Sequence, residues 1–279
     1  MKKKLFKLVL LVFFVCIFLY INNNWLQVNE YSIESERIPQ AFDGLKIVQL
    51  SDLHDAEFGN NHGRLVGLVK EEDPDLIFLT GDLVDSNRYD LEQSLRLVTQ
   101  LKDMAAVYYV TGNHEVAVNQ VPEISEALRE LGVHVLENES EVLVKEGEEL
   151  IISGVEDPLM KGLHHPEGAI EESLDKALGS VPQQDYKVLL SHRPEVFDTY
   201  VDRELDLVLT GHAHGGQFRI PGIGGLVAPG QGWFPAYTSG KHERGITTMI
   251  VSRGLGNSNI PFRILNRPEV VVVTLRSEE

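Results

Sequence analysis

The sequence predicts an α/β domain that follows a single membrane-spanning helix. Apolar runs of strand length recur along the chain, and each leads into Asp, Asn, His or Gly. Amphipathic segments with helical spacing separate the first three runs, as in a strand–helix–strand fold. A separate apolar run, residues 8–21, stands near the N-terminus and is typical of a membrane anchor.

Residues 1–24 are predicted to be an uncleaved anchor. The apolar run is about 21–26 Å long as a helix if Leu5 and Phe6 are counted, because a helix rises about 1.5 Å per residue. A cleaved signal peptide is the alternative, but its cleavage requires small residues just after the run. Three asparagines and Trp25 follow instead, and the first alanine is Ala41. The polar residues 25–40 are expected to form a juxtamembrane linker.

The charges beside the anchor predict its orientation. Lys2, Lys3, Lys4 and Lys7 precede or open the apolar run, and no basic residue follows it until Arg37. Because positive flanks stay inside, we expect a single-pass protein of the cell membrane with a cytoplasmic N-terminus and an extracytoplasmic body. Cys16, the only cysteine, lies in the anchor, so the exported part has no thiol to oxidise.

Composition excludes several classes of protein. The chain of 279 residues is 43% hydrophobic and 24% charged, unlike disordered, collagen-like or disulfide-stapled proteins. It has 42 acidic and 25 basic residues, and without the four N-terminal lysines 21 basic residues remain, a formal charge of −21. Such a body disfavours nucleic acid as a partner. Anionic lipid would also repel it unless it were tethered.

Residues 41–279 are predicted to form one catalytic domain, because no linker or repeat divides them. Helical spacing is found in 63–72 and 91–104. In the second half, a hairpin is expected with its turn near Gly147. The runs expected as strands are 45–52, 75–82, 106–113, 150–157, 187–193, 205–212, 247–254 and 269–275.

Five short motifs stand at the ends of these strands. They are Asp52-Leu53-His54, Gly81-Asp82-Leu83-Val84-Asp85, Gly112-Asn113-His114-Glu115, Ser191-His192 and Gly211-His212-Ala213-His214. In an extended segment residues i and i+2 share a face, so Asp52 and His54 can point into one pocket, as can His212 and His214. Carboxylate, imidazole and amide donors without sulfur suit Mn, Fe or Zn.

This series of motifs resembles the calcineurin-like metallophosphoesterase superfamily from about residue 45 to the C-terminus. Within it, GHAHGGQFRIPGIGG (211–225), APGQGWFPAYTSG (228–240) and VSRGLGNS (251–258) resemble the bacterial membrane-anchored or exported phosphodiesterases. The resemblance implies a metallophosphoesterase-type four-layer α/β/β/α sandwich of two facing mixed sheets. It also implies a hydrolase that cleaves phosphoric esters.

The resemblance further implies two divalent metal ions, Mn, Fe or Zn, and attack on the phosphate by a bridging hydroxide. Asp82 would bridge the ions. His114 would act as general acid or stabilise the leaving oxygen, and Asp85 would orient it. The implied ligands are Asp52, His54, Asp82 and His214 for one ion, and Asp82, Asn113, His192 and His212 for the other.

One branch of the superfamily, the protein phosphatases, has arginines that are missing here. Ser86-Asn87 and Thr111 stand where that branch has Arg-Gly and Arg. Without these arginines a dianionic monoester loses a bidentate partner, whereas a diester needs less neutralisation. We therefore expect a phosphodiesterase. The predicted anchor favours a substrate linked to lipid or the cell envelope.

Other interpretations stay open at this point. The enzyme could be a pyrophosphatase on a nucleotide-linked sugar-lipid, or the domain could be a non-catalytic, metal-stabilised surface module. Taken singly, Asp52, Asp82 and Asn113 are also typical of helix caps or turns, and Asp85 of a cap. Metal identity, substrate and oligomeric state are not determined by the sequence.

Several further residues have more than one interpretation. Arg193 could contact phosphate or pair with an acid, and Trp233 and Phe234 could contact lipid or substrate or pack in the core. The valine run 270–273 is expected to be a core strand. Five histidines are expected on the surface or in loops rather than as ligands: His62, His134, His164, His165 and His242.

Overall fold

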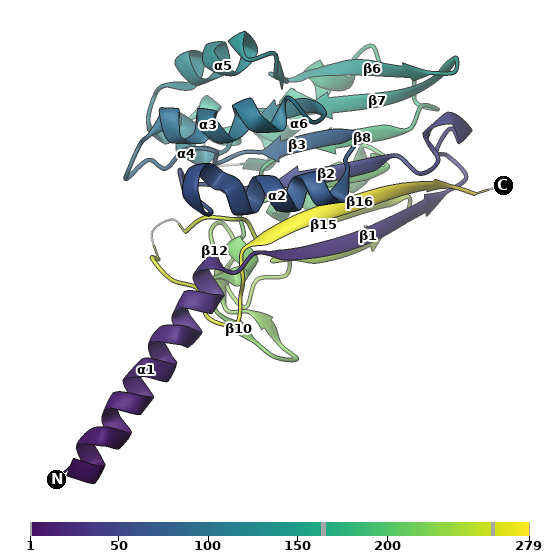
Figure 1. The fold of residues 1–279 in the computed structure, drawn as a ribbon. Coiled ribbons are helices and arrows are strands. Elements are labelled where there is room, and N and C mark those ends of the chain that lie inside the picture. Colours follow the sequence, from purple (N-terminus) through teal and green to yellow (C-terminus); the bar gives the residue numbers. More distant parts are fainter. Residues whose placement is uncertain (1, 163–165, 258–259, 279) are drawn as a thin grey trace.

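Two six-stranded mixed sheets face each other in the computed structural model, which describes residues 2–162, 166–257 and 260–278 (Figure 1). The first sheet has the order β1 (Gln27–Ser35), β16 (Glu269–Ser277), β2 (Lys46–Leu50), β3 (Leu76–Thr80), β4 (Ala106–Val110), β5 (His134–Val135). Strands β2 to β5 are parallel, and β16 is antiparallel to β2. Parallel pairing brings the carboxyl ends of β2, β3 and β4 to one edge.

The second sheet also contains four parallel strands, with one antiparallel strand at each edge. Its order is β14 (Gly240–Arg244), β15 (Thr247–Val251), β9 (Leu207–Thr210), β8 (Lys187–Leu190), β7 (Glu148–Gly154), β6 (Glu139–Lys145). The four inner strands are parallel and the two outer strands antiparallel to their neighbours. The hairpin β6–β7 turns at Gly147, whose φ of +85° suits glycine, as the sequence predicts.

The expected four layers are confirmed by the cores. Along β16, Val271 and Val273 pack between the sheets, while Val270 and Val272 pack under helices. This buried strand therefore contributes side chains to two hydrophobic cores. Helices α2 (Gly63–Glu72), α3 (Leu91–Leu101) and α5 (Val121–Glu130) cover the first sheet. Helices α6 (Pro166–Leu178) and α7 (Phe197–Asp202) cover the second. The short elements that remain are α4 (Asn113–Ala117), β10 (Arg219–Ile220), β11 (Gly224–Gly225), β12 (Val227–Ala228) and β13 (Gly232–Trp233).

Helix α1 (Lys2–Asn24) projects from this body as an isolated rod (Figure 1). Within the described residues it is the one helix long and apolar enough to cross a membrane. Its side chains are exposed until the last turn, where Asn22 is buried against the body. An apolar helix whose side chains are unpacked before its last turn is suited to a lipid environment.

The segment expected to be a juxtamembrane linker contains strand β1. It pairs in parallel with β16 from Gln27↔Glu269 to Ser35↔Ser277, and Ile33 is buried between the sheets. The sequence did not predict this strand, because an edge strand buries few side chains and its partner is about 240 residues away. The sheet therefore begins directly after the helix.

This pairing predicts a loss of stability in the Ile33→Ala variant. A linker residue would tolerate alanine within about 0.5 kcal/mol, whereas a buried isoleucine loses about 2–4 kcal/mol. Denaturant unfolding of the detergent-solubilised chain measures the difference. Val144→Ala on β6 is the matched control, because Val144 is also an apolar strand residue but is 60% exposed. Equal midpoints for the two variants would contradict the assignment of β1.

Candidate metal centre

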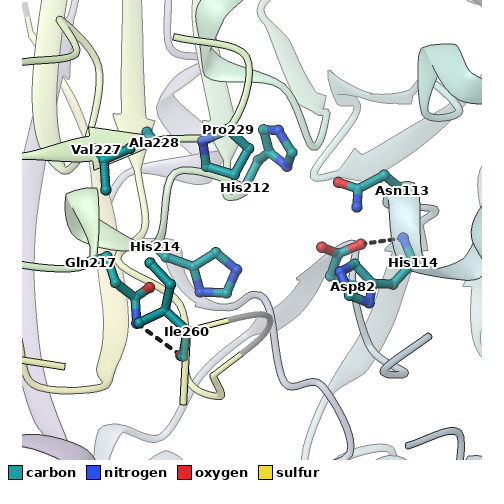
Figure 2. Close-up of a pocket in the computed structure, with 10 residues that line it drawn as sticks. All are labelled: Asp82, Asn113, His114, His212, His214, Gln217, Val227, Ala228, Pro229 and Ile260. Carbon is teal, nitrogen blue, oxygen red and sulfur yellow. Dashed lines mark hydrogen bonds between the residues drawn. The ribbon is translucent and has the colours of Figure 1, made fainter. Parts of the chain in front are cut away.

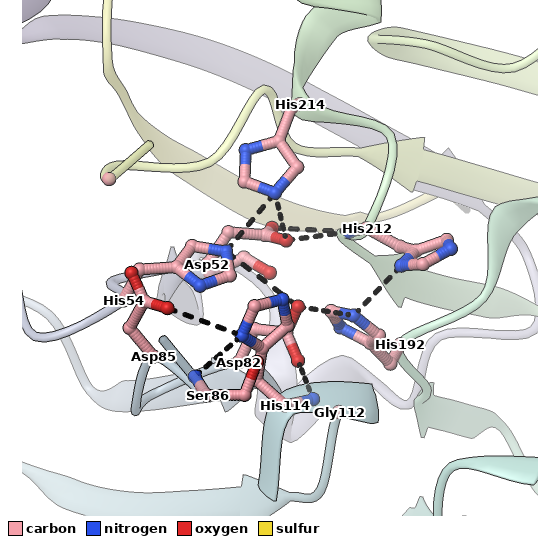
Figure 3. A network of polar contacts seen from close by, with 12 residues as sticks. Asp52, His54, Asp82, Asp85, Ser86, Gly112, His114, His192, His212 and His214 are labelled. Atoms are coloured by element: carbon pink, nitrogen blue, oxygen red, sulfur yellow. Dashed lines mark hydrogen bonds and ion pairs between the residues drawn. The ribbon is translucent and has the colours of Figure 1, made fainter. Parts of the chain in front are cut away.

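The carboxyl ends of five strands deliver polar side chains to one place between the sheets (Figure 3). Asp52 and His54 follow β2, Asp82 follows β3, and Asn113 and His114 open α4 just after β4. The second sheet contributes His192 after β8 and His212 and His214 after β9. The structure thus brings together all the residues that the sequence singled out as candidate ligands.

Asp82 lies at the centre of this cluster. Its Oδ2 is 3.2 Å from Nε2 of His192 and 3.7 Å from Nε2 of His54, while its Oδ1 accepts the backbone N–H of His114 at 2.8 Å. Ligand atoms of the described residues fall into three groups: Asp52, His54, Asp82 and His214; Asp82, His192 and His212; and His54, Asp85 and His114. Asp82 is common to the two groups made up of expected ligands, as a bridging carboxylate must be.

The backbone around the cluster is unusually constrained. Asp52, His54, Asp82, His212 and His214 all have positive φ, between 46° and 64°. Side chains other than glycine seldom adopt this region, and such conformations gather at functional sites. Close approach also requires glycine at Gly112, where a Cβ would stand 2.3 Å from Oδ1 of Asp82.

Burial sets the protonation of the histidines. It lowers the pKa of His54 and of His214 to about 3 and lowers that of His212 well below its usual value. These rings are therefore neutral at physiological pH, the form that binds metals. Burial also acts to lower the pKa of His192, but the carboxylates of Asp82, Asp52 and Asp157 together, Asp82 foremost, raise the pKa to about 10. The protonated His192 ring thus puts positive charge beside Asp82, where a bound metal ion could supply it instead.

The donor set fits two divalent cations. Nε2 of His54 faces Nε2 of His214 at 3.1 Å, and Nδ1 of His212 faces Nε2 of His192 at 3.2 Å. Pairs of ring nitrogens aimed at each other beside carboxylates are typical of ligands that converge on an ion. The Oδ1 atom of Asn113 is buried and has no hydrogen-bond partner among the described residues, which leaves it available as a ligand.

His114 is held by its backbone and by its ring. Its Nδ1 accepts the backbone N–H of Ser86 at 2.9 Å, so the neutral ring carries its proton on Nε2. Asp85, expected to orient this ring, has Oδ1 at 3.7 Å from Nδ1 and accepts hydrogen bonds from the Asn87 N–H and from Arg88. Asp85 therefore fixes the turn that supplies the Ser86 N–H.

Two groups near the cluster were given no role from the sequence. Glu115 is fully buried and accepts three backbone N–H groups, from Asp82, Val84 and Gly112. Burial, reinforced by the charge of Asp82, raises the pKa of Glu115 to about 7. Arg263 is also fully buried, with Nη2 3.3 Å from Nδ1 of His214. In the sequence, Glu115 has one possible signal, its position in the third motif, and Arg263 has none.

The Glu115→Gln variant is expected to unfold more easily and to bind metal more weakly. Glutamine has one acceptor oxygen, so its NH₂ group would face a backbone donor, a loss of about 1–3 kcal/mol. The loops carrying Asp82 and Gly112 would loosen, lowering metal affinity by about 10–100-fold. Metal titration and denaturant unfolding test this, with the exposed Glu123→Gln as control. Unchanged affinity would show that Glu115 does not position the ligands.

A cavity of about 310 Å³ opens onto the cluster (Figure 2). Asp82, Asn113 and His114 form one side, and Val227, Ala228, Pro229, Gln217 and Ile260 the other, with His212 and His214 between. The described lining residues include no lysine or arginine. The nearby Arg193 is bound to Asp157 through Nε and Nη2, at 2.6 and 3.0 Å, so of its two expected roles the ion pair is the one observed.

The remaining histidines have different environments. His62 is buried rather than on the surface, with Nε2 3.0 Å from the carbonyl oxygen of Gln93, because it lies between α2 and α3. His134 pairs with Glu141, and His242 is partly exposed. His164 and His165 lie outside the described residues. Trp233 and Phe234 are 74% and 65% exposed and do not join the core.

Residues 45–216 match the calcineurin-like phosphoesterase family. The chain is 31% identical to the uncharacterized metallophosphoesterase YkuE of Bacillus subtilis, covering 92% of this chain and 88% of the relative. It is 30% identical to phosphodiesterase YaeI of Escherichia coli, covering 82% of each. A transmembrane protein with metallophosphoesterase domain from Danio rerio is 29% identical, covering 90% of this chain and 57% of the relative.

Among solved structures, TT1561 of Thermus thermophilus has a similar fold. The TM-score is 0.52 at 15% identity, covering 76% of this chain and 90% of that one. A likeness at this identity concerns the arrangement of the sheets and helices alone.

Proposed function

The chain belongs to the calcineurin-like phosphoesterase family, and we propose that it is a membrane-anchored phosphodiesterase whose catalytic body lies outside the cytoplasm. Members of this family are hydrolases that use two divalent metal ions, and the buried Asp/His cluster is suited to them. The observation that carries the proposal is the position of Asp82, which is common to the two groups made up of expected ligands.

The proposed ligand sets are those expected from the sequence. Asp52, His54, Asp82 and His214 would hold one ion, and Asp82, Asn113, His192 and His212 the other. Ions bound there would supply an activated water and would neutralise charge on the phosphate. Oxygen and nitrogen donors of this kind accept Mn, Fe and Zn.

His114 is proposed to act on the leaving group. Its Nδ1 is engaged by the Ser86 N–H, so Nε2 carries the proton that the departing oxygen requires. The hydrogen bond from the His114 N–H to Asp82 keeps the ring next to the ligands. Because the residue is 6% exposed and lines the cavity, a substrate bound there is within its reach.

The cavity favours a diester over a monoester. No cationic side chain is found among its described lining residues, and Arg193 is neutralised by Asp157 and Glu195. A dianionic monoester would therefore lack a bidentate partner. The apolar wall of Val227, Ala228 and Ile260 suits a second, less polar substituent on the phosphate. That wall equally suits a pyrophosphatase acting on a nucleotide-linked sugar-lipid, which is the second candidate.

Anchoring is proposed from α1. Its four lysines lie at the N-terminal end, and its apolar side chains are exposed. The bias of positive charge would keep the N-terminus in the cytoplasm and place the body outside. The transmembrane relative supports an anchor of this kind.

The test is hydrolysis of bis(p-nitrophenyl) phosphate by the detergent-solubilised full chain with added Mn²⁺. We expect turnover of the diester to exceed that of p-nitrophenyl phosphate by about tenfold or more, the effect of one missing charged hydrogen bond. Faster turnover of the monoester would overturn the diester assignment. Two bound ions with no turnover of either ester or of a nucleotide sugar-lipid would favour the non-catalytic module.

A further inference from the structure

Six exposed apolar side chains lie in two segments, residues 217–237 and 260–268, and we call them the apolar rim. Its most exposed members are Trp233 at 74% and Ile223 and Phe234, both at 65%. The rim consists of Ile220, Ile223, Trp233, Phe234, Phe262 and Leu265. Figure 1 shows that α1 and the segment around β10 project from the same side of the body.

Hydrogen bonds tie the rim to the end of α1. The side chain of Asn23 accepts the backbone N–H of Arg263 at 2.8 Å and donates to its carbonyl oxygen at 3.3 Å. Asn22 accepts the N–H of Asn266 at 3.3 Å. Phe262 and Leu265 are the immediate neighbours of these two partners, so they lie at the helix exit.

The segment around β10 is joined to the same place. The N–H of Arg219 donates to the carbonyl oxygen of Ile264 at 3.0 Å, and the rings of Phe218 and Phe262 are 5.7 Å apart. Ile220, Ile223 and Leu265 line one concavity. The orientation of these apolar side chains relative to the anchor is therefore fixed by the fold.

Charge separates the rim from the rest of the body. Residues 217–237 and 260–268 contain no aspartate or glutamate, although the chain has 42 acidic residues. They do contain the partly exposed Arg219 and Arg267, whereas their third arginine, Arg263, is fully buried. Acidic side chains do lie nearby, since Glu71 lines a concavity with Trp25, and Glu167 and Glu195 line one with Phe234. An acidic body is repelled by anionic lipid, so the two acid-free segments are the part of this side that can approach a membrane.

An aromatic residue marks the expected level of the interface. Trp25 follows α1 directly, is 61% exposed, and has the guanidinium of Arg267 5.8 Å from its ring centroid. Tryptophan is enriched where a membrane helix meets water, and arginine is tolerated there beside lipid headgroups. Trp25 and the rim thus place the membrane surface at the body, without an intervening spacer.

The inner faces of the same segments line the cavity. Val227 and Ala228 of β12 pair with Trp233 and Gly232 of β13, so the cavity wall and the exposed Trp233 belong to one small hairpin. Ile260 lines the cavity two residues before Phe262 of the rim. The mouth of the cavity is therefore bordered by side chains suited to lipid.

We propose that the apolar rim rests in the membrane leaflet at which α1 emerges and that the cavity takes the phosphoester of a lipid from that leaflet. The phosphate would reach the Asp/His cluster while the acyl chains stay in the bilayer along the rim. This inference rests on the proposed anchoring and phosphoester hydrolysis and adds the class of substrate.

Membrane contact can be measured without activity, because the chain has two tryptophans, Trp25 and Trp233. The full-length W25F variant, reconstituted in phosphatidylcholine vesicles containing brominated lipid, reports on Trp233 alone. We expect strong quenching of its fluorescence. The W233F variant reports on Trp25 and tests the anchor. W25F/W233F/V144W, with its tryptophan on β6, is the control expected to escape quenching.

The outcomes separate the two proposals. Quenched Trp25 with unquenched Trp233 would refute the rim and leave the anchor standing. Quenching of neither would refute both the anchor and the rim. If Trp233 were quenched no more than the tryptophan of the β6 control, the rim would contact lipid no more than the rest of the body does. That result would also refute the rim.

The substrate class has its own test in the same vesicles. The probe is the lipid diester phosphatidyl-4-methylumbelliferone, and its turnover is divided by that of bis(p-nitrophenyl) phosphate. We expect I223S/W233S to lower this ratio by about tenfold, since apolar contacts with lipid are lost. V142S/V144S on β6 should leave the ratio unchanged. An unchanged ratio in I223S/W233S, or turnover of the soluble diester alone, would refute the lipid substrate while phosphoester hydrolysis stands.

Discussion

Replacement of His114 by alanine is expected to lower kcat for bis(p-nitrophenyl) phosphate by about 10²–10⁴-fold, the range found for general acids. The ring lines the cavity, and its neutral form has its proton on Nε2, because Nδ1 accepts the Ser86 N–H. Its backbone N–H, which holds Asp82, is kept in the variant. Metal content, measured by elemental analysis, should therefore stay near two ions per chain.

The alternative for His114 is a role as a ligand. His54, Asp85 and His114 also place ligand atoms within 4.8 Å of one another. Loss of one ion in His114→Ala would favour that role. Retention of both ions with full activity would exclude His114 from the chemistry. His134→Ala is the matched control, because His134 pairs with Glu141 at the sheet edge.

The inner strands could be predicted from the sequence because burial on both faces leaves a continuous apolar run. Thus LIFLT forms β3 and LVLT forms β9, each fully buried. Strand β1 could not be predicted in this way, since QVNEYSIES has only three apolar residues, without strict alternation, and only Ile33 is buried. Its assignment depends on pairing with β16, which no local pattern reveals.

The gathering of the candidate ligands in one place could be predicted because they follow strands whose carboxyl ends meet at one edge, whereas their assignment to two ions came from the family resemblance. Asp52, Asp82 and Asn113 are near one another for this reason alone. The residues that support these ligands were harder to predict from the sequence. Arg263 reaches His214 across 49 positions, from a loop with no regular structure, and Glu115 acts through backbone N–H groups that carry no sequence signature.

Substitution of Asp82 by asparagine is expected to abolish both metal sites. The carboxylate is 1% exposed and its Oδ2 faces both His192 and His54, so one substitution removes negative charge from both groups of ligands. An amide can still accept the His114 N–H, which limits damage to the fold. Turnover should fall by about 10³-fold or more, because charge stabilisation by the ions is lost.

Asp52→Asn is the matched comparison for this prediction. Asp52 is also buried, but it belongs to one group of ligands, with Oδ1 3.4 Å from Nε2 of His214. Its variant should keep the ion held by the other group. Thermal unfolding with and without Mn²⁺ distinguishes the two variants, since an ion stabilises only a chain that binds it. We expect Mn²⁺ to raise the Tm of the wild type most, that of Asp52→Asn less and that of Asp82→Asn not at all. Equal rises in the two variants would show that Asp82 does not bridge the ions.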